Sequence, residues 1–297
     1  MRVVVIGTVT FTRRCLEAAI DAGGEVVAVL TLAPDRAGFH GDYVDLGPTG
    51  ERLGIRVHRI ENVNDPQTIE LIRSLRPDVM FVFGWSQLLG RELLAIAPCI
   101  GSHPALLPRD RGRHPITWAL VDGLDETGLT FLWLDEGADS GDILWQRAFR
   151  VCPDDDAADV YAKIEDLAEA AVREFVPQLI NKTAPRRPQD ERLATYRRKR
   201  TDEERVIDWR RPRQEIHNLV RGLAKPYIGA VARVGGQDVL VWKTRILGED
   251  PGNVPVGGVV SAGNGSIAVR AGDGLLEVVE SSPDGLIEPG VTLEVAG

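Results

Sequence analysis

Short apolar runs alternate with amphipathic stretches through the first half of the chain. The apolar runs predict strands at residues 3–6, 26–30, 55–58 and 79–83 and a further strand that begins at Ile100. The amphipathic stretches predict helices at residues 12–22, 67–75 and 91–96. Strands and helices in alternation predict a parallel sheet covered by helices.

The pattern changes after Thr127. Two expected strands, Leu129–Leu134 and Ile143–Val151, flank a loop that is rich in Asp and Gly. Residues 155–180 then predict one long helix, because apolar side chains recur there at helical spacing. The expected apolar face of this helix consists of Ala158, Tyr161, Ile164, Leu167, Ala168, Ala171, Val172 and Phe175.

The last third of the chain has a different character. Residues 185–200 are rich in proline and basic side chains and predict an exposed linker. A short helix is expected at 213–223, followed by short strands separated by glycine turns, which is typical of a small β-barrel. The sequence therefore predicts an α/β fold with a first domain at 1–184, a linker at 185–203 and a second domain at 204–297.

Composition narrows the class of protein. The formal net charge of -9 argues against a generally cationic surface for nucleic acid. Cys15, Cys99 and Cys152 are few, lie far apart and have no metal-ligand spacing, which favours a reducing compartment and no metal site. The N-terminus has no signal-peptide pattern, and no apolar run has the length of a membrane span. We therefore expect a soluble, cytoplasmic protein.

Two polar segments are candidates for chemistry. Residues 101–115 directly follow an expected strand, and ligands in open α/β sheets bind beyond the carboxyl ends of strands, where His103 would lie. Residues 135–143 are dense in Asp and Gly, a pattern typical of exposed turns, and their spacing does not match an EF-hand loop. Taken singly, neither segment decides between a structural and a functional role. The remaining histidines His40, His58 and His217 are interpreted as structural or exposed.

Taken together, the two segments resemble the folate-dependent formyltransferase family. The shared pattern is His103-Pro104-x-Leu106-Leu107-Pro108, Arg111-Gly112, Pro115, Trp118-Ala119, Thr127-Gly128-x-Thr130 and Asp139-Ser140-Gly141-Asp142-Ile143. The resemblance continues at residues 201–209 and 217–221, and it is greatest to the amino-sugar N-formyltransferases of a family that also includes enzymes acting on methionyl-tRNA and on nucleotide-linked aminoarabinose. It implies a Rossmann-like catalytic domain followed by an OB-like β-barrel domain.

The resemblance also implies a reaction, in which an amine takes the formyl group of 10-formyltetrahydrofolate. A neutral amine would attack the formyl carbon, while His103 and Asp139 stabilise the developing oxyanion or move a proton. The implied donor-binding residues are Phe83, Gly84, Trp85, Leu88, Leu89, Pro108, Asp135, Gly137, Ala138 and Asp142. The implied acceptor-binding residues are Ser102, Arg109, Arg111 and Gly112.

Gly101 departs from the family pattern, which usually has an asparagine two residues before the histidine. Loss of such an oxyanion donor typically costs about 3 kcal/mol of transition-state stabilisation. Three interpretations stay open. Another group or a water replaces the amide, the acceptor is unusually nucleophilic, or the activity has drifted, for example to hydrolysis of 10-formyltetrahydrofolate.

Three acceptor classes compete. A nucleotide-linked amino sugar is favoured by the similarity at residues 201–209. Methionyl-tRNA is disfavoured, since residues 204–297 hold about as many acidic as basic side chains and phosphate contacts dominate affinity for nucleic acid. A small amine or hydroxylamine is compatible with Gly101. The expected partners are therefore small molecules, without nucleic acid or membrane; a folate-binding module without catalysis and a homodimer both stay open.

Overall fold

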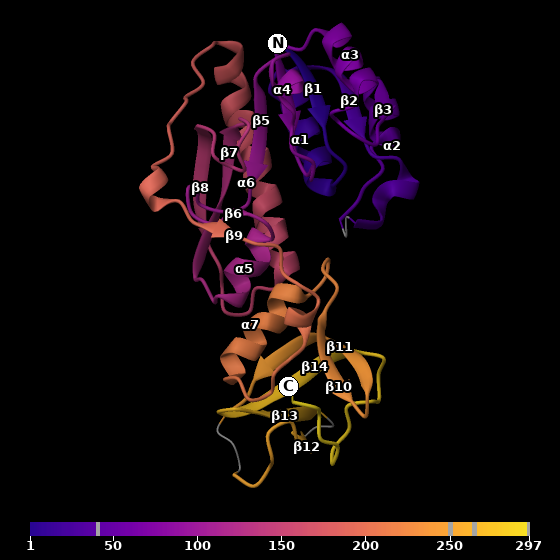
Figure 1. Ribbon diagram of the computed structural model, residues 1–297, viewed down its shortest axis with the longest axis vertical. Coiled ribbons are helices and arrows are strands. Elements are labelled where there is room, and N and C mark those ends of the chain that lie inside the picture. The colour runs from indigo at the N-terminus through magenta and orange to yellow at the C-terminus, as the bar shows by residue number, and fades with distance from the viewer. Residues whose placement is uncertain (40–41, 249–251, 263–265, 296–297) are drawn as a thin grey trace. The chain divides into compact units, whose positions relative to one another are not determined.

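The structure is a computed structural model that describes residues 1–39, 42–248, 252–262 and 266–295, so His40 lies outside the described residues. The chain divides into two compact units (Figure 1). The first unit comprises Met1–Pro115, Thr127–Phe149 and Ala162–Arg197, and the second comprises Ile116–Glu126, Arg150–Tyr161 and Arg198–Gly297. Neither unit is continuous in sequence, because two short internal segments group with the C-terminal residues.

A seven-stranded sheet forms the centre of the first unit (Figure 1). From edge to edge its strands are β3 (Val57–Arg59), β2 (Glu25–Thr31), β1 (Arg2–Ile6), β4 (Val79–Val82), β5 (Cys99–His103), β7 (Glu126–Trp133) and β8 (Ile143–Arg150). The strands from β3 to β5 run parallel, whereas β7 runs antiparallel to β5. The predicted Rossmann-like fold class is confirmed, with a sheet that is mostly rather than entirely parallel.

The structure contains the helices predicted at residues 12–22, 67–75, 91–96 and 155–180, and it adds a 3₁₀ helix at 34–39 and α-helices at 47–53 and 115–121 that the sequence pattern does not predict. They are α1 (Thr10–Asp21), η1 (Pro34–Phe39), α2 (Gly47–Leu53), α3 (Pro66–Leu75), α4 (Arg91–Leu94), α5 (Pro115–Val121) and α6 (Ala157–Ile180). The apolar face of α6 is displaced at its first turn, where Ala158 is exposed while Ala157 and Val160 are buried. No helix among the described residues is long and apolar enough to cross a membrane.

An aromatic cluster fills the core near the carboxyl ends of β4 and β5, where Phe131 of the antiparallel strand β7 pairs with Ser102. Phe83 and Phe131 meet edge to face at 5.3 Å between ring centroids, and Phe81 stacks on Phe83 at the same separation. Phe175 of α6 contacts Phe81 and Phe131. Buried aromatic pairs of this kind stabilise beyond their area alone, so the strand ends that carry the candidate site rest on a rigid base.

Part of the expected linker is ordered against the first unit. Residues 196–197 form a short strand, β9 (Tyr196–Arg197), which pairs in parallel with β6 (Arg111–Gly112) (Figure 1). A single 3₁₀ turn, η2 (Glu191–Leu193), precedes it. Residues 185–200 are largely exposed, as predicted. Within this segment, the backbone of Thr195 and Arg197 also hydrogen-bonds to the loop that follows His103.

From residue 198 on, the second unit is a small antiparallel sheet with one packed α-helix (Figure 1). Its elements are η3 (Glu203–Arg205), α7 (Arg213–Leu223), β10 (Ala230–Val234), β11 (Gln237–Ile246), β12 (Val259–Ser261), β13 (Ile267–Ala271) and β14 (Gly274–Ser282). The sheet order is β10-β11-β14-β13-β12. Residues 291–294 hydrogen-bond to Gly257 and Val259 beside β12 and to Arg233 of β10. The backbone thereby links both edges of the sheet, as expected for a small closed barrel.

Candidate active site

His103 ends β5 and is almost fully buried, with 4% of its surface exposed. Its Nε2 atom lies 2.8 Å from the backbone carbonyl oxygen of Asp110, and its Nδ1 atom lies 3.4 Å from Oδ2 of Asp139. The two segments singled out in the sequence therefore converge on one imidazole.

The protons of this imidazole follow from its neighbours. A carbonyl oxygen only accepts hydrogen bonds, so Nε2 of His103 carries a proton and donates it to Asp110. The opposite nitrogen then faces a carboxylate oxygen of Asp139. A second proton on Nδ1 turns this contact into an ion pair, whereas its absence leaves a lone pair opposite a carboxylate. The geometry thus places an imidazole nitrogen and a carboxylate oxygen opposite one another at the end of β5.

Asp139 lies on a tightly folded loop. Its φ of 57° is in the left-handed region, which non-glycine residues rarely adopt. Its Oδ2 accepts a hydrogen bond from the backbone N–H of Gly112 at 2.9 Å. Upstream, Oδ1 of Asp135 accepts from Gly137 N–H and from the hydroxyl of Ser140. Strained backbone of this kind persists only where surrounding contacts fix it, and it occurs often at functional sites.

The loop after His103 is held by residues that the sequence analysis did not select. The hydroxyl of Thr195 accepts from Asp110 N–H, and the guanidinium of Arg197 pairs with the Asp110 carboxylate at 2.6 Å. Gln189 contacts Arg111 and the Asp139 loop. These side chains are 50 to 87 residues from their partners in the sequence, so no local pattern indicates the contacts.

Arg111 is predicted to bind the acceptor, but its donors are used within the chain. The side chain is fully buried, and it donates to Gln189, to the carboxylate of Glu191 and to the hydroxyl of Tyr196. Hydrogen bonding to Glu191 is the main cause of the raised pKa of this guanidinium. We therefore assign Arg111 to holding residues 189–196 rather than to contacting the acceptor.

Arg111→Met is accordingly expected to lower Tm by a few degrees and kcat with it, while KM for the acceptor stays within about threefold. Differential scanning fluorimetry and steady-state kinetics measure the two effects. A large rise in acceptor KM at unchanged Tm would instead restore Arg111 to the acceptor site.

The predicted donor-binding residues after β4 have different environments. The Phe83 ring is completely buried in the aromatic cluster, so the expectation that it contacts the donor does not fit its position. Gly84 has a φ of 61°, and an added Cβ would lie 2.1 Å from a Val9 methyl, which explains the glycine. The Trp85 indole N–H is buried without a hydrogen-bond partner in the described part of the chain, and Leu88 is 70% exposed. The unpaired indole N–H just after β4 is compatible with a bound ligand that supplies an acceptor there.

The other predicted site residues lie around the His103–Asp139 pair or on its loops. Gly112 contacts Asp139 directly, and the Pro108 carbonyl accepts from Thr195 N–H. Ser102 is half-buried on β5, and Arg109 and Ala138 are exposed. Leu89 packs partly buried against the core, and the Asp142 carbonyl accepts from Trp133 N–H.

Gly101 is buried on β5 between β4 and β7. A Cβ added there would lie 2.5 Å from Cδ2 and 2.9 Å from Cγ of Leu134. Leu134 thus fills the space into which a side chain at position 101 would project, so the departure from the family pattern is built into the packing.

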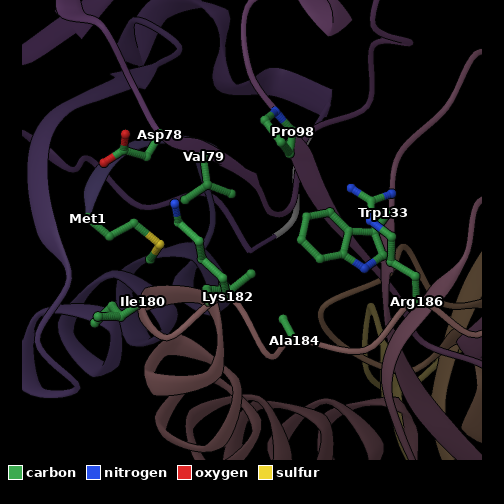
Figure 2. Close-up of a pocket in the computed structure, with 10 residues that line it drawn as sticks. Met1, Asp78, Val79, Pro98, Trp133, Ile180, Lys182, Ala184 and Arg186 are labelled. Atoms are coloured by element: carbon green, nitrogen blue, oxygen red, sulfur yellow. The ribbon is translucent and has the colours of Figure 1, made fainter.

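The pocket in Figure 2 is separate from this centre. It holds about 450 Å³ and is lined by Met1, Val79 and Pro98, which precede or begin β1, β4 and β5, with Arg186 over the Trp133 ring at 3.8 Å. His103 is at the carboxyl end of β5, the opposite edge of the sheet.

Cys99 begins β5, at the opposite edge of the sheet from His103, so it offers no nucleophile to this centre. Burial raises the pKa of the Cys99 thiol to about 12, so it stays protonated at neutral pH. A histidine and a carboxylate that together take up a proton suit direct transfer of a carbonyl group to an incoming nucleophile. The first unit is therefore an α/β fold with a candidate acid–base pair at the carboxyl edge of its sheet.

The chain belongs to the formyl transferase family. The family profile matches residues 1–176, and the profile of the formyl transferase C-terminal domain matches residues 199–287. A methionyl-tRNA formyltransferase of Caldanaerobacter subterraneus subsp. tengcongensis is 34% identical over 98% of this chain and 95% of its own length. The chain is therefore a folate-dependent formyltransferase.

Solved structures share the fold at lower identity. WlaRD, a sugar 3N-formyltransferase crystallised with dTDP and 5-N-formyl-THF, superposes with a TM-score of 0.72 at 16% identity, over 96% of this chain and 99% of its own. HypX from Aquifex aeolicus in complex with tetrahydrofolic acid gives a TM-score of 0.69 at 18% identity, over 95% of this chain and 44% of its own. An N-formyltransferase from Helicobacter canadensis, in complex with folinic acid and dTDP-3-aminofucose, gives a TM-score of 0.68 at 18% identity, over 93% of this chain and 98% of its own.

Proposed function

We propose that the protein transfers the formyl group of 10-formyltetrahydrofolate to the amine of an amino sugar carried on a nucleotide. The observation that carries the proposal is the convergence of His103 and Asp139, from two separate loops, at the carboxyl end of β5. In an open α/β sheet this edge is where ligands bind.

The proposed reaction uses the proton site between Nδ1 of His103 and Asp139. The neutral amine attacks the formyl carbon and forms a carbon–nitrogen bond, and the carbonyl oxygen becomes an oxyanion. The proton that the amine loses moves to the His103–Asp139 pair. The bond between the formyl carbon and N10 of the folate then breaks, and N10 takes up the proton that the pair accepted from the amine, so the pair returns to its starting state. The imidazolium produced by the first proton transfer stabilises the oxyanion.

The choice of acceptor is supported by fold and by charge. Two structural neighbours were crystallised with a dTDP nucleotide or a dTDP-amino sugar, and both share the fold over more than nine-tenths of this chain. Residues 204–297 carry twelve acidic and ten basic side chains, so this part of the chain offers no net attraction to a polyanion.

Formylation of methionyl-tRNA is the second candidate. The 34% identity to a methionyl-tRNA formyltransferase, over nearly the whole chain, favours it. The two candidates differ in their dependence on salt, because binding of tRNA releases counterions and weakens steeply between 50 and 200 mM salt, whereas a single nucleotide diphosphate releases few.

An acceptor panel tests the proposal. The protein is incubated with 10-formyltetrahydrofolate alone, with dTDP- and UDP-linked amino sugars, with methionyl-tRNA, and with hydroxylamine, and release of tetrahydrofolate is followed. We expect turnover that requires a nucleotide-linked amino sugar and changes less than about threefold between 50 and 200 mM salt. Turnover only with methionyl-tRNA would establish the second candidate, and turnover without any amine would mean hydrolysis.

A further inference from the structure

Gln189 lies between the two loops that form the site. Its side-chain NH2 donates to the backbone carbonyl of Asp139 at 2.8 Å and to that of Gly141 at 2.7 Å. Its Oε1 accepts from two atoms of Arg111, Nε at 3.1 Å and Nη2 at 2.8 Å. One amide therefore connects the loop after His103 to the loop that carries Asp139.

The orientation of this amide is determined by its neighbours. Both groups on one side of Gln189 are carbonyl oxygens, which only accept, and the group on the other side is a guanidinium, which only donates. If the amide were flipped, its oxygen would face two carbonyl oxygens and its NH2 group would face the guanidinium, so none of the four hydrogen bonds could form. The side chain uses both of its N–H groups and places its oxygen opposite Arg111, so its hydrogen bonding is complete.

These contacts bear directly on the strained residue. The carbonyl bonded to Gln189 belongs to Asp139, whose φ of 57° needs support from its surroundings. On its other side Asp139 is fixed by the N–H of Gly112, the residue that follows Arg111. The short strand β6 thus holds Asp139 in two ways. Gly112 of β6 hydrogen-bonds directly to the carboxylate, and Arg111 of β6 holds Gln189, which bonds to the backbone carbonyl.

We propose that Gln189 is a positioning residue for formyl transfer, which sets the orientation of Asp139 toward His103 by tying the Asp139 loop to β6. The proposal rests on the proposed role of the His103–Asp139 pair. The Gln189 side chain contacts the backbone carbonyl of Asp139, and its proposed effect on the reacting pair runs through that backbone contact.

Two substitutions at this position separate the contacts. Gln189→Met removes all four hydrogen bonds at similar size. Gln189→Glu keeps acceptors for Arg111 but places a carboxylate oxygen opposite the carbonyl oxygens of Asp139 and Gly141. It therefore removes only the two hydrogen bonds to the Asp139 loop. Gln67→Met, on the exposed side of α3, is the matched control.

We expect both Gln189 variants to lower kcat about 10- to 100-fold with KM for the formyl donor within about threefold, because small misplacements of catalytic groups have effects of this size. The Tm of Gln189→Glu should stay within a few degrees of the parent. The His103 ring resonances, assigned in proton NMR spectra by comparison with His103→Asn, should shift in both variants and not in Gln67→Met.

A kcat within twofold of the parent in both variants would overturn the proposal. So would a loss of kcat that follows Tm alone while the His103 resonances stay in place, since that pattern marks a merely structural residue. The NMR readout needs no acceptor, so a parent protein without amine-dependent turnover would refute the proposed function and still leave the positioning role tested.

Discussion

His103→Asn is expected to lower kcat for formyl transfer about 1,000-fold, within the range that general acid–base groups contribute. Asparagine can keep a donor toward the Asp110 carbonyl, but it cannot take up the proton that the imidazole shares with Asp139. Asp139→Asn should have a comparable effect, because an amide next to Nδ1 no longer stabilises an imidazolium. Single-turnover measurements with saturating donor and acceptor report this step directly.

Matched controls separate chemistry from folding. His58→Asn on β3 and Asp21→Asn at the end of α1 make the same chemical changes in the first unit, at residues outside the candidate site. Both should retain kcat within about twofold, and circular dichroism should show native folding in all four variants. A His103→Asn enzyme with kcat within tenfold of the parent would remove this imidazole from the proton transfer.

Gly101 and Leu134 are expected to behave as a coupled pair. Gly101→Asn alone should destabilise the protein by about 1–3 kcal/mol, because its Cβ would lie 2.5 Å from a Leu134 methyl and overpacking has costs of this order. Leu134→Ala opens that space. In the double variant Gly101→Asn/Leu134→Ala, kcat should rise by up to roughly 100-fold over Leu134→Ala alone, the scale of one added oxyanion donor.

A double-mutant cycle in kcat and in stability measures this coupling. Coupling in stability alone, with kcat of the double variant no higher than that of Leu134→Ala, would mean that position 101 lies outside the oxyanion environment. The interpretation that another group already replaces the asparagine would then be favoured over an unusually nucleophilic acceptor.

The strands and helices of the first unit follow from the sequence because burial and periodicity are local signals. Val3 to Ile6, for example, are apolar and completely buried, and α1 ends before Gly23, whose φ is 91°. The direction of β7 does not follow, since a strand that is buried on both faces lacks the alternation of apolar and polar residues that marks a half-exposed antiparallel strand.

The site could be predicted only in part. The His103 and Asp139 segments stand out by residue type, and the structure brings them within 3.4 Å of one another. Phe83 lies at a strand end, where alternation alone does not tell which face a ring covers, and it belongs to the core. Gln189 and Arg197 lie in a polar segment whose composition indicates only exposure, although their partners are loops far away in sequence.

The most direct test of the central claim is a crystal structure of the protein with 5-formyltetrahydrofolate, a formyl-bearing analogue of the donor. We expect the formyl group to bind at the carboxyl end of β5, within about 4 Å of the His103 ring or the Asp139 carboxylate, which is near-attack range. A folate bound with its formyl group elsewhere, for instance in the pocket at the opposite edge of the sheet, would contradict this expectation.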